Sequence, residues 1–176
     1  MVDITRFSLE TIAIWIVAYF VMEIPMRQIY LNMEEKGFLK RWYELKEFNA
    51  TTVVISDAFY VLIGVIIAYR IHNYLFKNII GLEKRFLYFF FIFLIVQIVG
   101  DLIFYYTLIS LPNNYRNKWV QFFIDYSNSA KLNALFGDSI FILVWTITTY
   151  LVSFLPADIL LMLLLALILI KTVLSS

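Results

Sequence analysis

Long apolar runs alternate with short charged stretches along this sequence of 176 residues. A helix needs about 20 consecutive apolar residues to cross a bilayer core about 30 Å thick. Five runs reach or approach that length, and each predicts a membrane-spanning helix. They cover residues 7–26, 51–69, 86–111, 134–155 and 158–174. We therefore expect an all-α, polytopic membrane helix bundle that residues 1–176 form as a single membrane domain.

The first run, residues 7–26, is the weakest of the five, because its apolar part is short and carries Glu10 and Glu23 near its ends. Glu23 and Pro25 stand where a cleaved signal peptide would carry small residues, so we expect the helix to be retained. Proline interrupts the hydrogen bonds of a helix, and we expect the span to end at Pro25. If this run does not cross the membrane, the bundle has four spans.

Two further stretches predict amphipathic helices that lie in the membrane interface. In residues 28–48, large apolar side chains recur at helical spacing among charged ones: Leu31, Phe38, Trp42 and Leu45. In residues 114–126, the corresponding side chains are Tyr115, Trp119, Phe122, Phe123 and Tyr126. The Ser-Asn-Ser sequence that begins at Ser127 predicts a break after the second helix.

The order of these elements predicts which of them share a side of the membrane. The N-terminus, the turn over residues 70–85 and Pro156 fall on one side. Both amphipathic helices and the C-terminus fall on the other. Nine of the 14 lysines and arginines lie on this second side, which favours its facing the cytoplasm. His72, the only histidine, is near the end of a span and is expected to be solvated.

The composition supports a lipid-facing protein and excludes several other classes. Hydrophobic residues make up 62% of the chain, and its mean hydropathy is +0.84. A net charge of +1 gives no positive field for nucleic acid, so we expect the lipid bilayer as partner. A homo-oligomer or a larger membrane complex is compatible with such a surface. With no cysteine and one histidine, we expect no metal site and no cofactor.

Carboxylates occur within four of the apolar runs: Glu23, Asp57, Asp101 and Asp138. With a rise of about 1.5 Å per residue, the three aspartates lie roughly 9, 15 and 6 Å from the side that holds the amphipathic helices. One aspartate facing lipid costs on the order of 3 kcal/mol. We therefore expect these acids to face the bundle interior, toward one another or toward water, where both amphipathic helices could cover them.

Asp101 is the deepest of these acids, and Gln97 precedes it by one helical turn. Lys171, near the end of the last run, is a basic group that could approach the cluster. The candidate residues for binding a proton or a cation are Asp101, Asp57, Asp138, Glu23, Gln97 and Lys171.

The same acids also have a purely structural interpretation. Asp138 can cap the start of its helix, and Asp57 can lie at the membrane interface. Glu23 stands one helical turn before Arg27 and can pair with it.

Enzyme motifs are absent from the sequence. There is no Gly-x-Ser-x-Gly elbow, no His-Glu-x-x-His pair and no phosphate-binding loop, so we expect no enzymatic activity. Intramembrane aspartyl proteases carry Gly-x-Gly-Asp, but Ile98 occupies the position of the first glycine before Asp101.

Four short segments carry a resemblance to a known group. They are Val-Gln-Ile-Val-Gly-Asp-Leu-Ile-Phe-Tyr (96–105), Phe-Phe-Ile-Asp-Tyr (122–126), Phe-Gly-Asp-Ser-Ile (136–140) and Ser-Asp-Ala-Phe-Tyr-Val-Leu (56–62). Together they resemble uncharacterised small multi-spanning membrane proteins of large DNA viruses, over about half of the chain. The resemblance implies a viral or host membrane and transfers no chemistry. Gly100 departs from it, since a polar residue is expected before the aspartate.

Three functions are compatible with these features. The leading hypothesis is a proton- or cation-responsive channel or transporter that uses Asp101, Asp57 and Asp138. The alternative is a non-catalytic assembly or scaffold subunit of a virion inner membrane or multisubunit complex, in which the acids bond helix to helix. A third is a protein that binds lipid or an apolar ligand under the two amphipathic helices.

Overall fold

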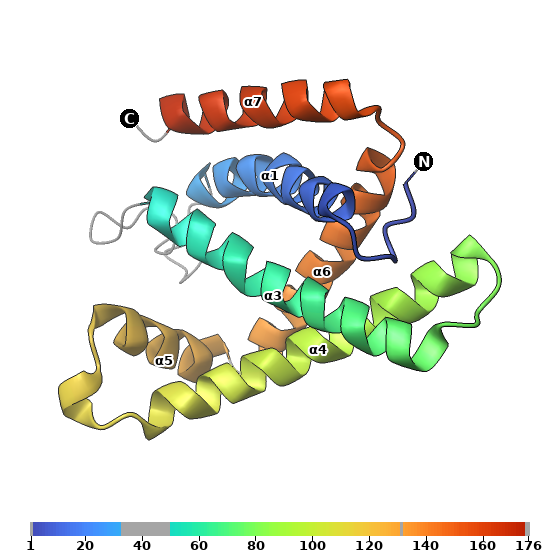
Figure 1. Ribbon diagram of the computed structural model, residues 1–176. Coiled ribbons are helices and arrows are strands. Elements are labelled where there is room, and N and C mark those ends of the chain that lie inside the picture. Colours follow the sequence, from blue (N-terminus) through green and yellow to red (C-terminus); the bar gives the residue numbers. More distant parts are fainter. Residues whose placement is uncertain (1, 33–49, 131, 175–176) are drawn as a thin grey trace.

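A computed structural model describes residues 2–32, 50–130 and 132–174 of the chain. Within these residues the protein is entirely helical, which confirms the expected all-α class (Figure 1). The α-helices are α1 (Leu9–Asn32), α3 (Ala50–Phe76), α4 (Leu82–Ser110), α5 (Lys118–Ala130), α6 (Leu132–Val152) and α7 (Ala157–Leu174). A short 3-10 turn, η1 (Asn113–Tyr115), lies between α4 and α5.

Each of the five apolar runs forms a helix, and four of these helices are long and apolar enough to cross a membrane. These are α1, α3, α4 and α6, while the apolar part of α7 is shorter. Large apolar side chains on their outer faces are exposed, such as Phe91, Ile95 and Ile103 of α4, which are 51–62% accessible. Water would disfavour such surfaces and lipid would not, so the exposed faces fit a helical membrane bundle.

Several predicted boundaries are wrong. Pro25 lies inside α1, which continues to Asn32. Apolar helices tolerate proline where neighbouring groups satisfy the freed carbonyl. The predicted interfacial helix over residues 28–48 therefore begins as part of α1, and residues 33–49 lie outside the described part of the chain. The turn predicted over residues 70–85 is confined to residues 77–81.

The second amphipathic helix, α5, starts and ends later than expected. Its start is fixed by Asn117, whose Oδ1 accepts hydrogen bonds from the backbone N–H groups of Trp119 and Val120, each at 3.0 Å. This is a helix N-cap. The helix then continues past Ser127 to Ala130, where a break was expected. Serine and asparagine cost only a few tenths of a kcal/mol each within a helix, so they did not end it.

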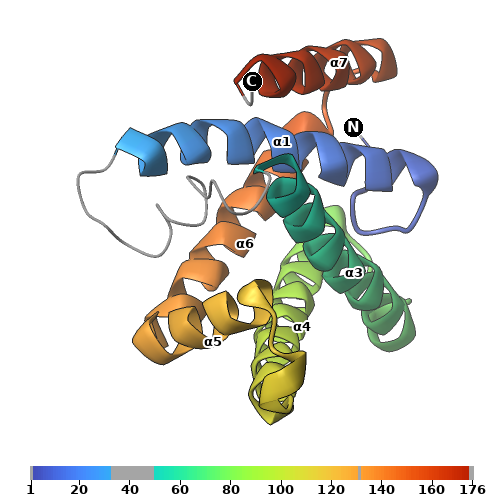
Figure 2. The ribbon, with the colours of Figure 1, turned by 90° about the vertical axis from the view of Figure 1, so that its left-hand side faces the viewer.

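The helices converge at one end of the molecule and diverge toward the other. α3 and α4 pack as an antiparallel pair, and α1 packs against both α6 and α7. Figure 2 shows α3, α4 and α6 spreading apart below α1, with α7 running beside α1 on the far side. α5 lies between the diverging ends of α4 and α6 and contacts both.

Buried aromatic rings hold the convergent part together. The rings of Trp15 and Trp145 are T-shaped, with centroids 4.8 Å apart. Trp145 Nε1 donates to the carbonyl oxygen of Trp15 at 3.0 Å, and Trp15 Nε1 donates to the hydroxyl of Tyr69 at 2.9 Å. That hydroxyl in turn donates to the carbonyl oxygen of Ile4 at 2.8 Å. The series links α6, α1, α3 and the N-terminal segment.

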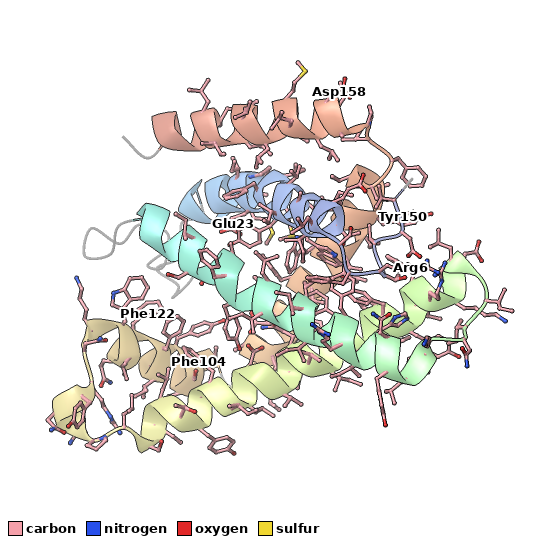
Figure 3. All side chains as sticks on the ribbon, in the orientation of Figure 1. Arg6, Glu23, Phe104, Phe122, Tyr150 and Asp158 are labelled. Atoms are coloured by element: carbon pink, nitrogen blue, oxygen red, sulfur yellow. The ribbon has the colours of Figure 1, made fainter. Side chains whose placement is uncertain are left out.

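The N-terminal segment lies where the sequence placed it, beside the α3–α4 turn and the end of α6. The backbone N–H of Val2 donates to the carbonyl oxygen of Ser153 at 3.1 Å. Asp3 forms an ion pair with Arg85 at 2.8 Å and another with Arg6 at 3.2 Å. Arg6 lies near the start of α4 in Figure 3.

His72, by contrast, is not solvated as predicted. It is 3% exposed, and its ring packs edge-on against Phe89 with centroids 5.8 Å apart. The prediction failed because it placed the end of the span at residue 69. α3 instead continues to Phe76, so His72 lies within the helix and faces α4.

Gly64 permits the close packing of α3 on α4. A Cβ at this position would lie 3.3 Å from the ring of Phe93, which is fully buried. We expect Gly64→Leu to destabilise the protein by about 1–3 kcal/mol through overpacking. The measurement is thermal unfolding in detergent, followed by size-exclusion chromatography.

Gly137→Leu is the matched control, because a Cβ there meets no atom within 4 Å. Both changes replace a helical glycine by leucine, so the gain in helix propensity is the same. An equal loss of stability in the two variants would contradict the close α3–α4 contact.

Candidate functional site

A cavity of about 1080 Å³ opens where the helices diverge. Its walls come from α1, α3, α4, α5 and α6. Its lining residues come from the C-terminal parts of α1 and α4, the N-terminal parts of α3 and α6, and α5, so it lies away from the N-terminal segment. The cavity therefore exists because these helices separate from one another after their common crossing.

The four predicted carboxyl groups all line this cavity, one from each of four helices: Glu23 from α1, Asp57 from α3, Asp101 from α4 and Asp138 from α6. Glu23 is buried, with 2% exposure, and the aspartates are partly buried. Gln97 of α4 lines the same cavity. Lys171 belongs to α7, and its side chain lies outside the described part, so its role stays a prediction.

Asp101 is held by a hydrogen-bonded pair of side chains. The hydroxyl of Tyr60 in α3 donates to its Oδ1 at 2.9 Å, and Nε2 of Gln97 donates to the same oxygen at 2.8 Å. Gln97 and Asp101 are four residues apart on α4, so they share a face. Gly100 lets Tyr60 approach, since a Cβ there would lie 3.2 Å from its hydroxyl.

The second oxygen of Asp101 has no such partner. Oδ2 is buried and makes no hydrogen bond to any residue that the structure describes. An unsatisfied buried oxygen costs about 1–3 kcal/mol, or more when it carries charge. A proton on Oδ2 would lower that cost, because it removes the buried charge.

The three aspartates of the cavity interact electrostatically without meeting at one point. Asp138 lies close enough to Asp101 and Asp57 to experience the charge of both. Yet no three carboxyl or imidazole groups among the described residues lie close enough together to hold a metal ion. The acids are therefore spread around the cavity wall, where they share a negative field.

Aromatic side chains form much of the remaining wall. α5 contributes Trp119, Phe122, Phe123 and Tyr126, and α4 contributes Phe104 and Tyr105. Figure 3 shows Phe104 on α4 and Phe122 on the neighbouring helix α5. Phe104 packs edge-on against Phe123 with centroids 5.3 Å apart, and the hydroxyl of Tyr105 donates to Asn128 Oδ1 at 3.2 Å. The amphipathic helix α5 thus covers one side of the acid-lined cavity.

The sequence predicted the acids and an amphipathic cover over residues 114–126, but not the contributions of Tyr60, Phe104 and Tyr105 to the wall. The prediction treated Trp119 only as an interfacial residue, and it did not connect Tyr60 with Asp101. One signal was available, because Tyr60 follows Asp57 by three residues and so shares its face of α3. No sequence signal identified Phe104, since it stands in a continuous apolar run.

The Tyr60–Asp101 hydrogen bond should be measurable in the stability of the protein. Tyr60→Phe is expected to lower the free energy of unfolding by about 1 kcal/mol, because it removes only the donor. In an Asp101→Leu background the same change should cost nothing, since the acceptor is already gone. Unfolding in mixed micelles with increasing dodecyl sulfate provides the measurement.

Tyr106→Phe serves as the control, because Tyr106 is on the same helix as Asp101 but 62% exposed. Its effect should stay within about 0.5 kcal/mol. An equal cost of Tyr60→Phe with and without Asp101 would show that the hydroxyl acts through another group.

Comparisons of the chain with protein-family models, with curated proteins and with solved structures found no match. They do not bear on the resemblance to small membrane proteins of large DNA viruses, which stays a prediction.

Proposed function

We propose that this chain is a multi-pass membrane protein in which the acid-lined cavity binds protons or cations as part of a transport or channel activity. The observation that carries the proposal is the convergence of Glu23, Asp57, Asp101 and Asp138, from four helices, on one cavity. Acids within apolar helices are costly and are found where they line a pathway or a site.

The electrostatics of the cavity support attraction of positive charge. Among the described residues that line it, none is lysine, arginine or histidine. In surroundings of low dielectric constant, the field of Asp101 and Asp138 is weakly screened. A cation or a proton that enters gains from both carboxyl groups, and Oδ2 of Asp101, which makes no hydrogen bond to the described residues, is a position where a proton can reside.

The position of the cavity suits access from one side of the membrane. It lies at the divergent end, next to α5, and that side carries the larger share of lysine and arginine in the sequence. In the proposed orientation this side faces the cytoplasm. The convergent end, closed by the Trp15–Trp145 contact and the Asp3–Arg85 ion pair, would then form the barrier toward the other side.

Transport can be tested with the purified protein in liposomes. We expect an imposed membrane potential to drive proton uptake above the rate of protein-free liposomes. Asp101→Asn should return the rate to that background, because asparagine keeps a hydrogen-bond acceptor but cannot carry a proton or a negative charge. A pH-sensitive dye inside the liposomes measures the flux.

The matched control is Asp158→Asn. Asp158 is exposed at the start of α7, far from the cavity (Figure 3), and its loss should leave the flux unchanged. The proposal fails if wild-type protein conducts neither protons nor monovalent cations, or if Asp101→Asn conducts as well as wild type.

One observation favours a second function, that of an assembly or scaffold subunit. The carboxylate of Asp101 bonds across the α3–α4 interface through Tyr60, which is what a structural acid in a membrane helix would do. In this case the acids would fix the helices so that the exposed apolar faces can contact other membrane proteins.

The two functions differ in what they require at Asp101. A scaffold is expected to tolerate Asp101→Asn, whose side-chain oxygen still accepts the bonds from Tyr60 and Gln97. It should lose its oligomeric state with Asp101→Leu, which removes the acceptor of both bonds and leaves the buried amide of Gln97 unsatisfied at about 1–3 kcal/mol. Native gel electrophoresis of detergent-solubilised membranes measures the assembly. Loss of assembly in both variants, or in neither, would contradict this function.

A further inference from the structure

The cavity is far larger than a proton or a metal ion requires. Its volume of about 1080 Å³ is at the upper end of the range of pockets that hold small organic molecules. A calcium or magnesium ion needs six or more oxygen ligands within about 2.6 Å, and the described carboxyl groups do not gather in that way. The size and the spacing of the acids together favour an extended ligand.

We propose that this cavity binds an organic cation with an apolar body, whose positive charge lies between Asp101 and Asp138 and whose body rests against the aromatic wall. The inference rests on the proposed function of the same site and names the class of cation. The two aspartates stand on different helices, so one ligand charge can interact with both while the helices stay apart.

The charge of such a ligand would interact with two carboxyl groups that no basic side chain among the described residues neutralises. Neither Asp101 nor Asp138 forms an ion pair with the described residues, and Oδ2 of Asp101 is buried without a hydrogen bond. Asp138 experiences repulsion from Asp101 and Asp57. A cation placed between the acids converts this repulsion into attraction, whereas an anion or a neutral polar group would not.

The apolar body of the ligand would pack against aromatic side chains of the cavity. Phe104 of α4 and the α5 residues Trp119, Phe122 and Phe123 line the same cavity as the acids. Aromatic faces attract cations, by about 0.5–2 kcal/mol for each well-placed ring. An inorganic ion would interact with the acids but would not need the aromatic rings. A neutral lipid tail would pack against the rings but would gain nothing from the acids.

The pattern of α5 agrees with this assignment. Gln121 and Asp125 are exposed on its outer side and bond to each other at 2.7 Å, while its aromatic residues line the cavity. An interfacial helix that covers an acidic cavity with aromatic residues presents a path for amphipathic cations, which gather at the membrane interface before they enter.

The test is equilibrium binding of tetraphenylphosphonium to the full chain in lipid nanodiscs, with empty nanodiscs as background. Tetraphenylborate, an anion of nearly the same size and shape, is the matched probe. We expect saturable binding of the cation, at least about tenfold tighter than that of the anion, because only the cation gains from Asp101 and Asp138.

Variants separate the charge from the aromatic wall. Asp138 makes no hydrogen bond within the described residues, so Asp138→Asn removes a charge and leaves the packing intact; it should weaken cation binding about tenfold. Phe104→Leu should weaken it about threefold through the loss of one ring. Their controls are Asp158→Asn and Phe154→Leu, at exposed positions outside the cavity, which should bind as wild type does.

The outcomes distinguish this inference from the proposed function. No saturable cation binding, or equal binding of both ions unaffected by Asp138→Asn, would overturn the organic-cation site. If the liposome flux still depended on Asp101 in that case, transport of protons or small cations would be supported without an organic-cation site. Cation binding that depends on Asp138, without any flux, would support the organic-cation site and contradict the transport function. The results for Asp138→Asn and Phe104→Leu can be interpreted if both variants elute from a size-exclusion column as wild type does, which shows that they fold.

Discussion

The crossing of α1 over α6 at the Trp15–Trp145 contact determines the rest of the architecture. Indole rings from both helices are fully buried there, and hydrogen bonds continue from them to Tyr69 and Ile4. Because the helices cross at this point and do not run parallel, they must separate with distance from it (Figure 2). Rigid helices that are joined at one end leave space at the other, and the space becomes the cavity.

The acids occupy the divergent end for a related physical reason. Closing the helices there would bring Asp57, Asp101 and Asp138 together in surroundings of low dielectric constant, where like charges repel strongly. Separation of the helices lowers this repulsion, and α5 supplies the apolar cover that the gap would otherwise lack. α3 and α4 stay in contact from Phe76 to Tyr60, where Gly64 allows close approach and the Tyr60–Asp101 bond reinforces it.

The helices and the similar depth of the acids could be predicted from the sequence, since both follow from the length of the apolar runs and a fixed rise per residue. The sequence could not give the lengths of α1 and α3, because Pro25 and the residues around His72 owe their helical state to tertiary packing. The sequence could not predict that Tyr60 bonds to Asp101 either, because this pairing depends on the register of α3 against α4. The volume of the cavity depends on crossing angles, which no local pattern specifies.

Asp101 unites the two functional interpretations, because its two oxygens have different surroundings. Oδ1 accepts both Tyr60 and Gln97 and so belongs to the α3–α4 interface, while Oδ2 is left without a bond. A purely structural acid would be expected to satisfy both oxygens, since each unsatisfied one is costly. A purely mobile proton carrier would not need two fixed donors on one oxygen. Fixing Oδ1 holds the whole carboxyl group in position beside the cavity, so the same hydrogen bonds that join α3 and α4 also position a group that can bind a proton or attract a cation.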